Sequence, residues 1–183
     1  MELHGTGNSR QSGVTALELL ITLSISGLLL VTGAPALQQF SRLQEIKAAT
    51  TALQQDLLAA RGDAVLNGRV VIACPGAPES GCASGPDWSG GWIVFEDSDG
   101  DRALSVGEAV IRQGQLMQEV TVLTTSGRGP LRFFPDGSAP GTNMSISLCG
   151  LSGPADARKL VVSNIGRIRR DTWPDLDTNR CPV

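Results

Sequence analysis

Four acidic residues in the middle of the chain have the spacing of a calcium-binding loop. Asp97, Asp99, Asp101 and Glu108 occupy positions 1, 3, 5 and 12 of a twelve-residue stretch. Carboxylates at these positions are the calcium ligands of EF-hand loops. Position 6, where such a loop needs glycine, is Arg102, which places a cation among the ligands. We therefore predict a solvated hairpin turn without a metal, and calcium binding is the alternative.

A second chemically distinctive segment lies near the C-terminus and reads Gly166-Arg167-Ile168-Arg169-Arg170. In an extended strand, Arg167 and Arg169 point to one face and Arg170 to the other. Two guanidinium groups about 7 Å apart on a strand can each bind a phosphate, because the planar fork donates two hydrogen bonds. No aromatic residue alternates with the arginines, so we expect contact with the backbone of double-stranded DNA, independent of sequence. The alternative is that these arginines solvate an edge strand and discourage aggregation.

The overall charge limits how such a site can work. The formal net charge of the 183-residue chain is −3, which excludes a globally cationic nucleic-acid-binding protein. From Asp156 to the C-terminus, however, the chain contains six basic residues and four acidic ones. A DNA contact would therefore be local, and we expect it to be weak.

The four cysteines, Cys74, Cys82, Cys149 and Cys181, indicate disulfide bonds. Zinc sites usually combine closely spaced cysteine pairs with histidines, and this chain has no C-x-x-C pair and a single histidine. An even cysteine count is typical of an oxidising compartment. Of the three pairings that four cysteines permit, we predict Cys74–Cys82 and Cys149–Cys181.

These groups must be positioned by the elements around them, and the first is an apolar helix. Residues 14–37 contain one charge, Glu18, and the uncharged run after it spans residues 19–37. As a helix, this run is roughly 28 Å long, about the thickness of a hydrocarbon core. A secretory signal peptide has a shorter apolar run, and a plain membrane anchor gives no role to Glu18. We predict a transmembrane helix over residues 14–37.

The helical pattern continues beyond the apolar run. Apolar residues recur at intervals of three or four through residues 38–67, with charged and amide side chains between them. Asn67-Gly68 is a suitable helix end. We therefore predict one long helix over residues 14–66, with its second part, residues 38–67, outside the membrane.

Residues 68–183 predict a β-rich domain. Short apolar segments are separated by turn residues, and no second long helix is indicated. The predicted strands cover residues 69–74, 91–96, 109–112, 120–124, 131–134, 145–149, 159–163 and 166–170. The expected fold class is α+β, with one or two antiparallel sheets packed on the long helix.

The N-terminal segment also carries a family resemblance. Gly13-Val14-Thr15-Ala16-Leu17-Glu18-Leu19 resembles the class III signal of type IV prepilins. The resemblance implies that residues 1–13 are a leader, that a prepilin peptidase cuts after Gly13, and that the new N-terminus at Val14 is methylated. It differs from the family pattern in that the first mature residue is Val and not Phe. A buried acid needs a positive partner in lipid, and the free amine of a neighbouring subunit can be that partner for Glu18.

Motifs in the rest of the chain indicate one branch of the type IV prepilins. The segment Trp88-Ser89-Gly90-Gly91-Trp92-Ile93-Val94-Phe95, the acidic loop and the cysteines resemble the GspH/FimT family. That family contains minor pilins of type IV pili and minor pseudopilins of type II secretion. The resemblance covers residues 13–181 and implies a pilin-like fold, a single-pass inner-membrane anchor, and a periplasmic or filament-borne C-terminal domain. It also implies that the partners are other pilin or pseudopilin subunits.

The resemblance also bears on the arginine segment. Gly166, Arg167 and Arg169 match the Gly-Arg-x-Arg motif with which FimT-type minor pilins hold DNA during uptake, and we add Arg170 and Lys159 on grounds of charge. A protein-secretion role without DNA binding, as in GspH-type pseudopilins, is the alternative function. A subunit that only primes pilus assembly is a further one.

Enzymatic function is not indicated. The only histidine, His4, lies in the expected leader, and no nucleophile–base pair, P-loop or dinucleotide fingerprint is present. We therefore predict a non-enzymatic protein without a cofactor.

Overall fold

The computed structural model describes residues 14–114, 119–150 and 153–171. The chain divides into two units, Met1–Phe40 and Ser41–Val183. The helix α1 (Ala16–Asn67) belongs to both. Its bounds agree with the helix predicted over residues 14–66.

In the first unit, the described apolar side chains of α1 are exposed to the surroundings, as at Leu17, Leu23 and Leu30. Among the described residues, no helix was found to be long and apolar enough to cross a membrane. The transmembrane helix over residues 14–37 therefore stays a prediction.

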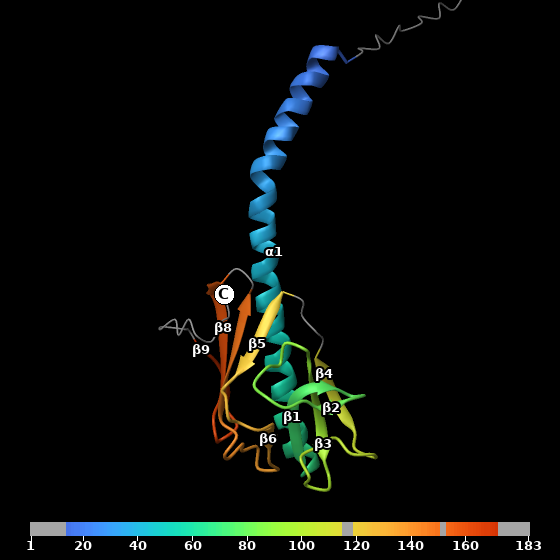
Figure 1. Ribbon diagram of the computed structural model, residues 1–183, viewed down its shortest axis with the longest axis vertical. Coiled ribbons are helices and arrows are strands. Elements are labelled where there is room, and N and C mark those ends of the chain that lie inside the picture. The colour runs from blue at the N-terminus through green and yellow to red at the C-terminus, as the bar shows by residue number, and fades with distance from the viewer. Residues whose placement is uncertain (1–13, 115–118, 151–152, 172–183) are drawn as a thin grey trace, which may run out of the picture. The chain divides into compact units, whose positions relative to one another are not determined.

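The second unit consists of the second half of α1 and two antiparallel sheets, which Figure 1 shows on that part of the helix. The first sheet has the order β2-β1-β3-β4, and β6 also pairs with β1. These strands are β1 (Val70–Ala77), β2 (Gly81–Cys82), β3 (Trp92–Asp97), β4 (Val110–Gly114) and β6 (Leu131–Phe133).

The second sheet has the order β5-β7-β8-β9. Its strands are β5 (Val120–Thr124), β7 (Met144–Gly150), β8 (Gly153–Val162) and β9 (Ile168–Asp171). An isolated bridge between Asp87 and Leu123 connects the segment before β3 to β5. The α+β fold is thus confirmed, and every predicted strand has a counterpart. The short strand β2 was not predicted.

The core lies where α1 meets both sheets. From Ile46 to Ala64, a stripe of helix residues three or four apart is buried, because that spacing places their side chains on one face. They are Ile46, Ala49, Leu53, Leu57, Ala60 and Ala64. The inner faces of the sheets cover this stripe with residues that include Val94, Phe133, Ile146 and Leu160.

Polar contacts fix the helix against each sheet. On the first sheet, the indole nitrogen of Trp92 donates a hydrogen bond to Asp56 Oδ2 at 2.9 Å. The Trp92 ring lies so close to Gly114 that a Cβ atom there would be 2.0 Å from it. The indole therefore fills the space that a side chain would occupy on β4.

Candidate functional site

The arginine segment forms one arm of the β8–β9 hairpin. The Gly166 amide donates to the Ser163 carbonyl at 2.8 Å, and the Ser163 amide donates to the Arg167 carbonyl at 3.0 Å. Gly166 has a φ of +73°, which allows the short loop to close. A residue with a Cβ atom would be strained in this conformation. The strand begins at Ile168, so the prediction that Arg167 lies within an extended strand is wrong. The loop geometry, and not strand alternation, decides its direction.

Gly166 is in close contact with a second loop. A Cβ atom at Gly166 would lie 1.9 Å from the Gly137 carbonyl oxygen, a backbone atom that cannot easily move away. The same oxygen accepts a hydrogen bond from Arg61 Nε on α1 at 2.8 Å. The hairpin is thereby seated on the helix through Gly137. Gly166 has a structural reason to be glycine, which is to position the arginines that follow it.

Arg167, Arg169 and Arg170 of the hairpin are all exposed, and they differ in the partners that their side chains have. Within the described residues, the Arg167 side chain makes no hydrogen bond or ion pair. Arg169 forms an ion pair with Asp171 at 3.1 Å, and its side chain is 50% exposed. An exposed pair of this kind contributes only about 0–1 kcal/mol, so a phosphate can compete with Asp171 for the guanidinium.

Arg170 and Lys159 have different surroundings. Arg170 points to the opposite face from Arg169, as predicted, and its guanidinium donates to Gln54 and Thr51 on α1 at 2.6 and 3.0 Å. Arg170 therefore attaches the edge strand to the helix. Lys159 is partly buried on β8 and lies directly opposite Asp171 in the sheet register.

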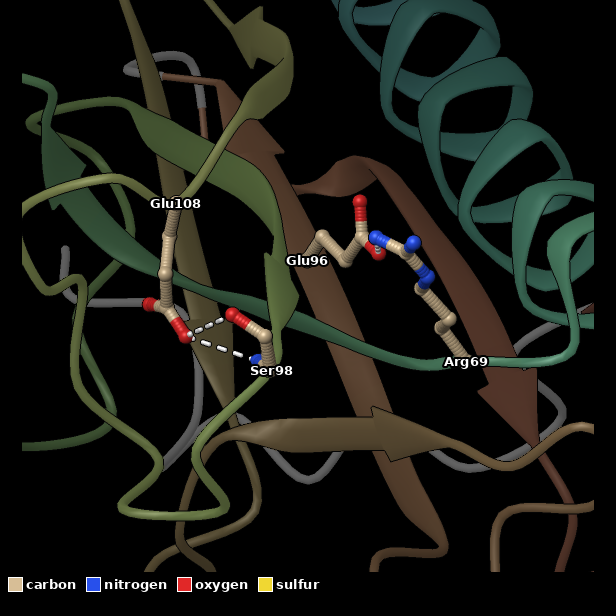
Figure 2. A network of polar contacts seen from close by, with 4 residues as sticks. All are labelled: Arg69, Glu96, Ser98 and Glu108. Atoms are coloured by element: carbon tan, nitrogen blue, oxygen red, sulfur yellow. Dashed lines mark hydrogen bonds and ion pairs between the residues drawn. The ribbon is translucent and has the colours of Figure 1, made fainter.

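The acidic loop joins β3 to β4, and its carboxylates bind its own backbone. Figure 2 shows Glu108 reaching Ser98, whose amide donates to Glu108 Oε1 at 2.7 Å, while Arg69 pairs with Glu96 nearby. Burial acts to raise the pKa of Glu108, but hydrogen bonds from the backbone amides of Ser105 and Ser98 outweigh it. The pKa of Glu108 therefore lies below its ordinary value of 4.5.

Three of the four predicted calcium ligands come together in this loop. Carboxylate oxygens of Asp97, Asp99 and Glu108 lie within 4.8 Å of one another. Asp101 is not part of that group, and its carboxylate accepts hydrogen bonds from the Ala103 amide and the Ser105 hydroxyl. The predicted metal-free hairpin turn and the alternative of calcium binding both fit this arrangement.

The first predicted disulfide is present. Cys74 and Cys82 are bonded, with their Cα atoms 5.6 Å apart, and they link β1 to β2. Cys149 on β7 is buried and does not carry a free thiol. Its predicted partner, Cys181, lies outside the described residues.

The predicted processing site falls partly within the described residues. Gly13 lies outside them, and Val14 is exposed. The Glu18 amide donates to the Thr15 hydroxyl at 3.3 Å, so Thr15 caps the start of α1. Glu18 lies in the first turn, where a negative charge is favourable to the helix.

Two positioning residues were not found by reading the sequence. Gly137 follows Pro135-Asp136, a turn signal that could have marked it as a tight loop. Arg61 lies among other polar residues of α1, and nothing local distinguishes it. Its contact with Gly137 spans 76 positions of the chain.

Comparison with known proteins agrees with this architecture. The family model of the type II transport protein GspH matches residues 49–166. The comparison with curated proteins gave no significant match.

Two solved structures share the fold. The type IV minor pilin FimU of Pseudomonas aeruginosa aligns with a TM-score of 0.56 and 24% identity, over 78% of this chain and 96% of FimU. The minor pseudopilin EpsH of the Vibrio cholerae type 2 secretion system aligns with a TM-score of 0.52 and 13% identity, over 72% of this chain and 99% of EpsH. With its buried helix stripe, its two antiparallel sheets and a family match across most of both, the chain belongs to the GspH family of minor pilins and pseudopilins.

Proposed function

We propose that this protein is a filament subunit of a type IV pilus that holds double-stranded DNA through Arg167 and Arg169, in a binding and not a catalytic role. The observation that carries the proposal is the seating of these two exposed arginines on a hairpin that Gly166 holds against the Gly137 carbonyl. A cation placed on a fixed hairpin loses less conformational freedom on binding than one on a free tail.

We propose that two arginines of the segment contact phosphate. Arg170 is engaged by two acceptors on α1, which leaves Arg167 and Arg169 of the three arginines in residues 166–170. Each phosphate contact contributes about −0.9 to the slope of log affinity against log salt. We therefore expect a slope of about −2, whereas release of Arg170 from the helix would bring it to about −3.

The test is a duplex-binding measurement on the full chain in mild detergent. The double variant Arg167→Ala with Arg169→Ala should lose retention of a DNA duplex in a gel-shift assay, and its salt slope should vanish. Arg112→Ala is the matched control, because Arg112 is exposed on β4 and, among the described residues, its guanidinium donates only to the neighbouring Ile111 carbonyl. The DNA proposal fails if the double variant and the control retain the duplex equally.

The proposal includes the anchor and its processing. We infer cleavage after Gly13 by a prepilin peptidase, an inner-membrane span over residues 14–37, and pairing of Glu18 with the Val14 amine of a neighbouring subunit. The support is the uncharged run from Leu19 to Leu37, the exposed apolar side chains of α1, and an acid in its first turn. Mass spectrometry of the mature protein should find Val14 as a methylated first residue, and any other start would refute this step.

A second candidate function is a pseudopilus subunit in protein secretion, without DNA binding. The match to the type II transport protein GspH favours it. Deletion of the gene separates the two: loss of transformation with normal exoprotein secretion supports the pilus function, and the reverse result supports the pseudopilus. Loss of piliation without any duplex affinity would instead indicate a priming subunit.

A further inference from the structure

A pocket of about 360 Å³ lies beside the first sheet and is separate from the arginine hairpin. The end of β1 contributes Pro75, and the segment before β3 contributes Trp88. The acidic loop contributes Arg102, and the segment before β6 contributes Arg128 and Pro130. The lining thus combines apolar residues with two arginines, a combination that suits an anionic group on an apolar body.

The walls of the pocket are held rigidly. The Ala83 amide donates to the Pro75 carbonyl at 2.7 Å, next to the Cys74–Cys82 disulfide. The Trp88 amide donates to the Val122 carbonyl of β5 at 2.8 Å. A ligand would therefore enter a preformed cavity.

Arg102 occupies a conformation that favours glycine. Its φ is +66°, and it is the one described residue other than glycine with a positive φ. The left-handed conformation costs an ordinary residue roughly 1–2 kcal/mol. Within the described residues, its guanidinium forms no hydrogen bond or ion pair that would offset this cost. The hydrogen bonds of the loop hold this backbone, because the Arg102 amide donates to Asp97 Oδ1 at 3.5 Å and the Ala103 amide donates to Asp101 Oδ1 at 2.7 Å. No contact of the side chain with a described residue explains why arginine and not glycine occupies this position.

Arg128 supplies the second cation. It lies between Gly127 and Gly129 and is exposed. Its guanidinium also makes no hydrogen bond or ion pair with a described residue. The pocket lining thus contains two arginines and no acid, and a guanidinium group is a suitable donor for a carboxylate.

We propose that this pocket binds the carboxylate of an acidic peptide segment of a partner protein, through Arg102 and Arg128, with the apolar flank of the peptide against Ala83 and Pro130. A single carboxylate fits better than a polyphosphate, because Asp99 and Asp101 lie in the same loop just before Arg102 and would repel an extended anion. The site is independent of the DNA proposal, since it uses different arginines on a different sheet.

The test uses the full chain in mild detergent and isothermal titration calorimetry. The probe is an acetylated, amidated pentapeptide Gly-Phe-Glu-Phe-Gly, and its control carries Gln in place of Glu. A third peptide, Gly-Phe-Phe-Gly with a free C-terminus, distinguishes a terminal carboxylate from a side-chain carboxylate. We expect a carboxylate-bearing peptide to bind roughly tenfold more tightly than the Gln control, as charge-assisted hydrogen bonds imply.

Three variants locate the binding. Arg102→Gly removes the guanidinium at a φ that glycine tolerates, so the unfolding midpoint should stay equal or rise while peptide affinity falls roughly tenfold. Arg128→Ala changes an exposed loop position and should weaken binding similarly, and Arg112→Ala should have no effect. Equal binding of the Glu and Gln peptides with no binding of the free C-terminus would overturn the proposal. So would unchanged affinity in both pocket variants, or displacement of the peptide by a short DNA duplex or inorganic phosphate.

Discussion

Replacing Gly166 by alanine tests whether this glycine positions the arginine hairpin. The new Cβ atom would lie 1.9 Å from the Gly137 carbonyl oxygen, and neither atom can rotate away because Cβ is fixed to the backbone and the oxygen is part of it. The left-handed conformation adds roughly 1–2 kcal/mol for a residue with a Cβ atom. Overpacking against a fixed neighbour adds typically about 1–3 kcal/mol, so we expect a total loss of roughly 2–5 kcal/mol in the free energy of unfolding.

Gly141 provides a matched control for the conformational part. Its φ is also +73°, but no atom lies within 4 Å of the position that its Cβ would take. Gly141→Ala should therefore lose only the conformational share. The measurement is urea unfolding of the full chain in mild detergent, followed by tryptophan fluorescence. The difference between the two variants isolates the clash with Gly137.

The two variants should differ by at least about 1 kcal/mol, the lower end of the overpacking cost. Equal losses would mean that the hairpin moves away from Gly137 at little cost. That result would refute the inference that Gly166 positions the loop that carries Arg167. The Gly166→Ala variant should also bind duplex DNA more weakly, since its hairpin is displaced.

Three further perturbations have outcomes that follow from the same contacts. Replacing Cys74 and Cys82 by serine opens a short loop of sequence separation 8, and should cost about 2.5 kcal/mol in the unfolding free energy, measured by thermal or urea unfolding. Glu108→Gln should destabilise the protein most at neutral pH, and its difference from the wild type should shrink as the pH falls below 4.5, because the lowered pKa of Glu108 stabilises the fold only while it is ionised. Calcium titration should produce no binding heat at calcium concentrations up to the order of 1 mM, and a micromolar affinity lost in Asp97→Asn would refute the hairpin interpretation of the acidic loop.

Much of the fold could be predicted because it depends on local pattern. The intervals of three or four between Leu53, Leu57, Ala60 and Ala64 place these apolar residues on one helix face, whatever packs on it. The strands were predicted from short apolar segments between turn residues. The strand β2 was not predicted because two residues are too few to show any periodicity. The Cys74–Cys82 disulfide holds this strand against β1.

The candidate site could be predicted only in part. The pattern Gly166-Arg167-Ile168-Arg169 predicted a phosphate-binding segment, and Arg169 and Arg170 do point to opposite faces. The pattern could not show that Arg170 donates hydrogen bonds to Gln54 and Thr51, because these partners lie 116 and 119 positions earlier in the chain.

The sequence by itself determined the residues available for chemistry and the elements that carry them, because residue type and periodicity are properties of the chain. Only the tertiary structure decided which arginines are free. Contacts between distant segments engage Arg61 and Arg170, leave Arg167 exposed, and bring Arg102 and Arg128 to one pocket. Such contacts depend on how the sheets pack on α1, and local pattern does not encode that packing.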